Sequence, residues 1–203
     1  MKEACRFCIN QLILFAGLLW PTTALAHAPI EGLGKFYGHF LHPVLVPEYA
    51  LLVLAIALLL GQNGQQAARA GLAAMAMGLG IGLVLLWQRP DLGTGQSPIL
   101  VGAMTAGAAL SLDRRLHWGI PAGLALASGV VLGLDPEIAG LVGRDAVLAA
   151  SGLVCGAVFY PTIIAGSTTE NPAPWLRVGR RIVGAWITAA ALLVLALAAR
   201  SPG

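Results

Sequence analysis

Two histidines and a glutamate lie close together at the start of the first long apolar run, at His39, His42 and Glu48. Imidazole nitrogen suits nickel, copper and zinc, and a carboxylate adds negative charge beside the ion. His39 and His42 are three positions apart, so on a helix they share one face. These residues predict a site for a divalent metal ion such as nickel, cobalt, copper or zinc.

Two prolines, Pro43 and Pro47, lie in the same stretch. Proline lacks a backbone N–H and disfavours helical geometry at the residue before it. In a regular helix Glu48 would point about 120° away from His42, so the three side chains can meet only if the backbone is broken. We therefore expect a first helix broken by prolines within residues 42–47. The alternative is a plain helix start with the histidines at the level of the lipid headgroups.

The composition is that of a membrane protein. Hydrophobic residues make up 58% of the chain and charged residues 10%, whereas an ordinary soluble domain carries about 25% charge. The basic residues lie in short loops, so the net charge of +3 does not indicate nucleic-acid binding. We expect an all-α polytopic protein whose main partner is the lipid bilayer.

Six apolar runs follow one another with only brief connections between them. A membrane-spanning helix needs about 20 residues, and the third run is the shortest of the six. The runs predict one six-helix transmembrane domain over residues 27–203. They cover residues 39–60, 71–88, 98–112, 118–134, 145–166 and 178–199.

Residues 1–26 have the pattern of a secretory signal peptide, with basic Lys2 and Arg6, an apolar stretch, and an Ala-x-Ala cleavage site at residues 24–26. An uncleaved first helix is the alternative. Cleavage would make His27 the amino terminus. An amino-terminal histidine can chelate copper through its amine and its imidazole, so His27 is a secondary candidate ligand.

The basic residues also predict the orientation. With the mature N-terminus outside, six Lys and Arg residues fall in inner loops and four in outer segments, as the positive-inside rule requires. Acidic residues then gather on the outer side, where they could concentrate cations. These acidic residues are Glu31, Asp91, Asp135, Glu137 and Asp145.

Pairs of glycines separated by three residues predict close helix approach inside the bundle. They are Gly78 and Gly82, Gly119 and Gly123, Gly129 and Gly133, and Gly152 and Gly156. Catalytic and nucleotide-binding signatures are missing from the sequence, including G-x-S-x-G, H-E-x-x-H, the P-loop and the dinucleotide fingerprint. We therefore do not expect an enzyme, or a permanently bound cofactor.

The run from His27-Ala28-Pro29-Ile30 through Phe36-Tyr37 and His42-Pro43 to Gly61-Gln62 resembles the HupE/UreJ family. The resemblance implies a small bacterial inner-membrane protein with a cleaved signal, about six helices and a link to nickel supply. The family signature is His-Pro followed by Asp-His. His42-Pro43 matches its first half, whereas Glu48-Tyr49 keeps a carboxylate and loses a histidine. This loss implies weaker binding or a different metal.

Two hypotheses of function follow. The first is a permease that passes a divalent transition-metal ion inward without ATP. The second is a non-transporting accessory or assembly subunit of a larger membrane-bound complex, for which glycine-rich helices with few buried polar groups are equally suited. Either protein could form a homo-oligomer. The His39, His42 and Glu48 set favours the first hypothesis, and the altered signature favours the second.

Overall fold

The structure is a computed structural model that describes residues 33–169 and 174–200, and all regular elements in these ranges are helices. The predicted signal peptide and His27 lie outside the described residues. The all-α prediction is confirmed. The elements are α2 (Gly34–Leu45), α3 (Pro47–Gln62), α4 (Gln65–Gln88), the short 3-10 helix η1 (Pro90–Leu92), α5 (Gln96–Ser111), α6 (Gly119–Gly133), α7 (Pro136–Ala139), α8 (Gly143–Thr169) and α9 (Pro174–Arg200).

Three helices, α4, α8 and α9, are long and apolar enough to cross a membrane, with 24, 27 and 27 residues. Helices α2 and α3 meet the same requirement together if they form one bent span. Helices α5 and α6 have 16 and 15 residues, fewer than the roughly 20 of a regular span. The described residues thus have the helices of a membrane protein. By length and composition, three of these helices can span a membrane, or four spans are present if α2 and α3 together form one. The sequence predicted six spans.

The first helix is broken at one residue, Val46. Its backbone is extended, with φ −87° and ψ 118°, and α2 and α3 meet there at an angle of 69°. Pro47 is the first residue of α3, and the ring of a proline disfavours helical geometry at the residue before it. Pro43 lies inside α2 without interrupting it. The break is therefore narrower than the predicted stretch of residues 42–47, and it follows from Pro47.

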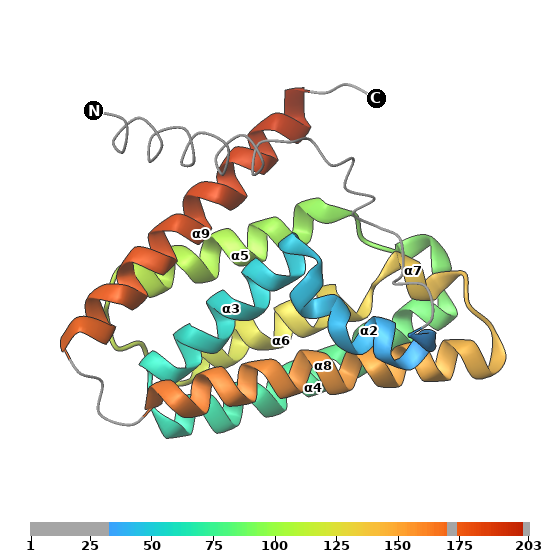
Figure 1. The fold of residues 1–203 in the computed structure, drawn as a ribbon, viewed down its shortest axis with the longest axis horizontal. Helices are drawn as coiled ribbons and strands as arrows, with labels where there is room; N and C mark the ends of the chain where they lie inside the picture. The colour runs from blue at the N-terminus through green and yellow to red at the C-terminus, as the bar shows by residue number, and fades with distance from the viewer. Residues whose placement is uncertain (1–32, 170–173, 201–203) are drawn as a thin grey trace, which may run out of the picture.

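Helix α3 is the centre of the bundle (Figure 1) and packs against α2, α4, α5, α6, α8 and α9. Its sequence is apolar on all sides, which is the pattern of a fully surrounded helix. Leu52, Ile56 and Leu59 are completely or almost completely buried. The central helix therefore holds its first turn, with Glu48 and Tyr49, in a fixed place relative to the other helices.

Glycines bring α4 and α6 into direct backbone contact. A Cβ atom on Gly78 would clash with the backbone of α6 at the Leu126 carbonyl, and one on Gly133 would crowd the Leu79 carbonyl of α4. Gly82 and Gly129 are equally enclosed. These two predicted glycine pairs therefore face one another, as the small-x-x-x-small pattern requires.

A third glycine pair fixes α2 against α8. A Cβ atom on Gly152 would meet the carbonyl oxygen of Phe36, and one on Gly156 would meet that of Phe40. Both phenylalanines lie on α2, three residues before His39 and two residues before His42 respectively. The close approach of these two helices therefore sets the position of the predicted histidine ligands.

Candidate metal-binding site

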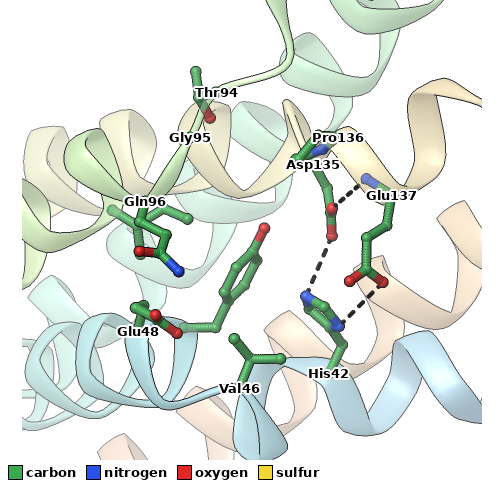
Figure 2. Close-up of a pocket in the computed structure, with 11 residues that line it drawn as sticks. His42, Val46, Glu48, Thr94, Gly95, Gln96, Asp135, Pro136 and Glu137 are labelled. Carbon is green, nitrogen blue, oxygen red and sulfur yellow. Dashed lines mark hydrogen bonds and ion pairs between the residues drawn. The ribbon is translucent and has the colours of Figure 1, made fainter. Parts of the chain in front are cut away.

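A cavity of about 110 Å³ lies at the break between α2 and α3. Three segments that are distant in the sequence line it (Figure 2): the break itself, the segment that enters α5, and the turn between α6 and α7. The lining residues are His42, Val46, Glu48, Tyr49, Thr94, Gly95, Gln96, Ile99, Asp135, Pro136 and Glu137. Two predicted ligands, His42 and Glu48, thus share one cavity because the bend brings them to the same side.

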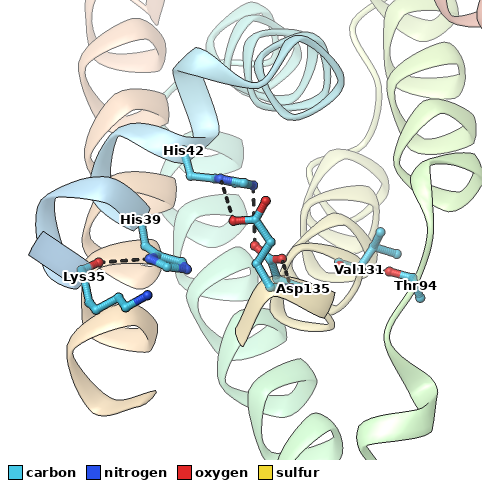
Figure 3. Close-up of polar contacts among 7 residues, drawn as sticks. Lys35, His39, His42, Thr94, Val131 and Asp135 are labelled. Carbon is cyan, nitrogen blue, oxygen red and sulfur yellow. Dashed lines mark hydrogen bonds and ion pairs between the residues drawn. The ribbon is translucent and has the colours of Figure 1, made fainter. Parts of the chain in front are cut away.

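Backbone hydrogen bonds hold the second and third segments together. The Thr94 N–H donates to the Leu134 carbonyl at 3.0 Å, and the Thr94 hydroxyl donates to the Val131 carbonyl at 3.4 Å (Figure 3). Asp135 then begins α7 as its N-cap, because its Oδ1 accepts the Glu137 N–H at 2.9 Å. Asp is favoured as an N-cap because its side chain accepts a backbone N–H, and Pro is favoured at the first helical position because that position needs no N–H donor. The local sequence therefore turns both Asp135 and Glu137 toward the cavity.

The imidazole of His42 lies between two carboxylates (Figures 2 and 3). Its Nε2 is 3.6 Å from Oδ2 of Asp135, and its Nδ1 is 3.8 Å from Oε2 of Glu137. The side chain of Asp135 is only 1% exposed, whereas that of Glu137 is 37% exposed. One carboxylate therefore lies deep in the protein and the other at the mouth of the cavity.

Asp135 is the most strongly buried acidic residue of the site. Its Oδ1 caps α7, but its Oδ2 has no hydrogen-bond partner. Burial raises the pKa of Asp135, because the charged form loses its hydration, and the neighbouring His42 imidazole opposes that shift. A buried polar atom without a partner is unfavourable. A cation beside Oδ2 would remove this penalty.

His39 shares a face with His42, as predicted, and the two rings stack with their centroids 6.1 Å apart. Its Nδ1 contacts the Lys35 carbonyl at 2.9 Å (Figure 3). Because a carbonyl oxygen only accepts, the neutral ring carries its proton on Nδ1 and presents a lone pair on Nε2. That Nε2 is buried and has no hydrogen-bond partner. His39 does not line the cavity, so the structure places it behind His42.

Tyr49 lies in the first turn of α3, directly after Glu48. It is 6% exposed, and its ring meets the His42 ring edge-on with the centroids 4.5 Å apart. The residue at this position thus contacts His42 directly and lines the same cavity.

Asp135 and Glu137 are the acidic residues of the cavity that the sequence did not single out as ligands. The sequence indicated only that both lie on the same predicted side as His42, directly after an apolar run. Within residues 33–169 and 174–200, no three His, Cys, Asp or Glu side chains are placed close enough to hold one ion together. Two ligands at about 2.0–2.2 Å from one ion lie roughly 3 Å apart, so His42 and Asp135 would have to move slightly toward each other.

Comparison of the chain with protein-family models, with curated proteins and with solved structures gives no match. The chemistry of the cavity therefore has to be judged from its own side chains. Its walls carry one imidazole and three carboxylates, one of which has a buried oxygen without a hydrogen-bond partner. These are groups that attract a cation.

Proposed function

We propose that this chain is a permease for a divalent transition-metal ion in the bacterial inner membrane. The cavity at the break between α2 and α3 receives the ion from the outer side. The observation that carries this proposal is the position of Asp135. Its Oδ2 is buried without a hydrogen-bond partner and lies 3.6 Å from Nε2 of His42. The resemblance of the His42-Pro43 segment to the HupE/UreJ family supports the same function.

In this proposal all six apolar segments cross the membrane, with the mature N-terminus outside. The three loops that form the cavity then share the outer end. The opposite end of α3 meets a basic loop, because the Gln62 side chain donates to the Arg114 carbonyl at 3.3 Å. Acidic residues at one end and arginines at the other agree with an outer, cation-collecting cavity.

Release of the ion on the inner side requires a conformational change. Between the cavity and Gln62, the central helix is covered by apolar side chains such as Leu52, Ile56 and Leu59. A hydrated or partly hydrated ion cannot cross such a region without polar partners. The single extended residue Val46 is the place where α2 and α3 can move relative to each other, as in other transport sites built on broken helices.

Uptake by proteoliposomes that contain the purified chain tests the proposal. A panel of manganese, iron(II), cobalt, nickel and zinc should include at least one ion that enters faster than into protein-free vesicles. His42→Ala and Asp135→Asn should each lower that uptake about tenfold or more at limiting ion concentration, because changes around a metal ligand typically have effects of this size.

Asp91→Asn is the matched control. Asp91 lies on the same predicted side but is 63% exposed and paired with Arg89, so its replacement should leave uptake unchanged. Absence of binding and uptake for the whole panel would contradict the permease. The accessory-subunit hypothesis would then be the better account of the chain.

A further inference from the structure

Arg180 is the only basic side chain that is buried among residues 33–169 and 174–200, with 7% of its surface exposed. It lies on the face of α9 that packs against the bundle, in line with Gly184, Ile187 and Ala191. The other buried residues of that face are small or apolar. Because arginine is always charged in proteins, a permanent positive charge occupies a packing position.

The guanidinium of Arg180 has few partners inside the chain. Its Nη1 donates to the Thr168 carbonyl at 3.5 Å, which is longer than an ordinary N–H···O bond, and its Nε is buried without a partner. None of the carboxylates in the described part of the chain forms an ion pair with it, and Asp113 acts on it only from a greater distance. A buried charge without a counter-charge is unfavourable. An anion from outside the described residues would remove this penalty.

This guanidinium lies at the inner end of the bundle in the proposed orientation. Thr168 is in the last turn of α8, and a Cβ atom on Gly61, near the end of α3, would contact the Thr168 hydroxyl. The ends of α3 and α8 therefore meet beside the start of α9 (Figure 1). Arg177 and Arg181, both exposed, flank Arg180 on α9. The place is therefore basic, and it lies at the level of the lipid headgroups, because the last apolar run begins there.

We propose that Arg180 is a binding site for a phosphate group, which an acidic lipid headgroup or a free phosphate ion would supply. A guanidinium binds phosphate through two parallel N–H donors, and the free Nε supplies one of them. Long basic side chains extend toward the interface, so a small shift of the guanidinium brings it to the ligand. Basic pockets between membrane helices on the inner side are suited to acidic headgroups. The inference goes beyond the proposed permease and does not depend on a metal ion.

Thermal unfolding of the full chain in a neutral detergent measures the binding. The detergent is supplemented with phosphatidylglycerol, with the same amount of phosphatidylcholine, or with inorganic phosphate. Phosphatidylglycerol should raise the Tm of the parent by about 5 °C or more at saturation, because a ligand that binds only the folded chain stabilises it. Phosphatidylcholine carries no net charge and should have little effect. An increase with phosphatidylglycerol alone assigns the site to a lipid headgroup, and an equal increase with inorganic phosphate assigns it to a soluble phosphate.

Arg180→Gln should abolish this increase in Tm. Without added ligand the variant should be about as stable as the parent, because it no longer buries an unpaired charge. Arg180→Lys keeps the charge but loses Nε, so it should retain only part of the increase. Arg69→Gln is the matched control, since Arg69 is an exposed arginine on the same predicted side. It lies on α4, whereas α9 packs mainly against α5 and α3, so the increase should remain.

Three results would overturn the inference. The first is that neither phosphatidylglycerol nor phosphate raises the Tm of the parent. The second is an equal reduction in Arg69→Gln and Arg180→Gln, because the basic inner surface as a whole would then attract the ligand. The third concerns Glu170, which lies outside the described residues. If Glu170→Gln and Arg180→Gln lower the ligand-free Tm equally and non-additively, the chain supplies its own counter-charge. The metal-uptake experiment tests the proposed function separately from all three.

Discussion

The Nε2 atom of His42 lies 3.6 Å from the Oδ2 atom of Asp135. This contact joins the last turn of α2 to the turn that ends α6. The Asp135 oxygen is buried and has no hydrogen-bond partner, and the His42 imidazole is the ionisable ring that it faces. The two residues should therefore be energetically coupled, and a metal ion should compete for the same contact.

Thermal unfolding of the metal-free chain tests this coupling. His42→Ala leaves the Asp135 carboxylate without its imidazole, whereas the double variant with Asp135→Asn also removes the charge. The double variant should therefore unfold at a higher temperature than His42→Ala alone, with a coupling energy of about 0.5–3 kcal/mol. His117→Ala, which changes an exposed histidine of the α5–α6 loop, should combine with Asp135→Asn additively. If His42→Ala also combines additively with Asp135→Asn, the contact between His42 and Asp135 does not contribute to stability.

The pH dependence of stability should carry the signature of Asp135. Burial raises its pKa above the ordinary value of 3.8, so the folded chain holds this proton at pH values where the unfolded chain has lost it. The associated stability is present at low pH and is lost as the pH rises through the folded-state pKa. As the pH rises above 3.8, the parent should therefore lose more stability than Asp135→Asn. Asn also caps helices well, so the variant should keep α7.

Asp91→Asn is the control for this pH experiment. The hydrogen bond from Arg89 lowers the pKa of Asp91, so the contribution of Asp91 has the opposite sign and is lost as the pH falls. Because Asp91 is exposed, its effect should be small. Equal pH profiles for the parent and Asp135→Asn would contradict the burial argument.

Part of the site could be predicted from the sequence. The residue types and spacing of His39, His42 and Glu48 identified the segment, and Pro47 predicted a break that brings His42 and Glu48 to one cavity. Asp135 and Glu137 could not be chosen from among the outer acidic residues. Their contact with His42 depends on which loops meet at one end of the bundle, and helix periodicity carries no information on neighbouring helices.

The fold was predictable to a similar extent. All six apolar runs form helices, the first one interrupted at Val46. The central position of α3, however, depends on packing between helices, which the sequence does not reveal. The glycine pairs show which part of the packing the sequence could not predict. Gly152 and Gly156 face α2 directly, whereas a Cβ atom on Gly123 would meet nothing within 4 Å. Small residues at this spacing permit close approach, but they do not show that a partner helix is there.

Replacing these glycines by alanine tests which of them contact a neighbouring helix. Gly156→Ala would force a Cβ atom against the Phe40 carbonyl and should destabilise the chain by about 1–3 kcal/mol. Gly123→Ala fills open space inside a helix and should stabilise it by about 0.5–1 kcal/mol. Thermal unfolding in detergent measures both. Equal effects of the two variants would show that α2 and α8 do not pack as closely as described.

The proposed orientation can be tested by cysteine labelling in intact cells. Cys5, Cys8 and Cys155 are first replaced by Ser, and single cysteines are placed at Gly140, after α7, or at Gln66, in the first turn of α4. A membrane-impermeant maleimide should label position 140 from outside and position 66 only after the membrane is opened. The reverse pattern would place the cavity on the inner side and contradict uptake in the proposed direction.

The last prediction concerns the bend itself. Val46 is extended, and the ring of Pro47 disfavours helical geometry there. Pro47 stands at the first helical position, where its missing N–H removes no bond. Pro47→Ala should therefore allow α2 and α3 to straighten. Glu48 and Tyr49 would then turn away from His42, and metal affinity should fall.

Spin labels at Tyr37 on α2 and Gln66 on α4, both exposed, report the bend as a distance distribution. Pro47→Ala should shift or broaden it, together with the loss of affinity. Pro43→Ala is the matched control, because Pro43 already lies inside α2 and its replacement should leave the distribution unchanged. If Pro47→Ala changes neither the distances nor the affinity, the packing of the surrounding helices against α3, rather than the proline, maintains the bend.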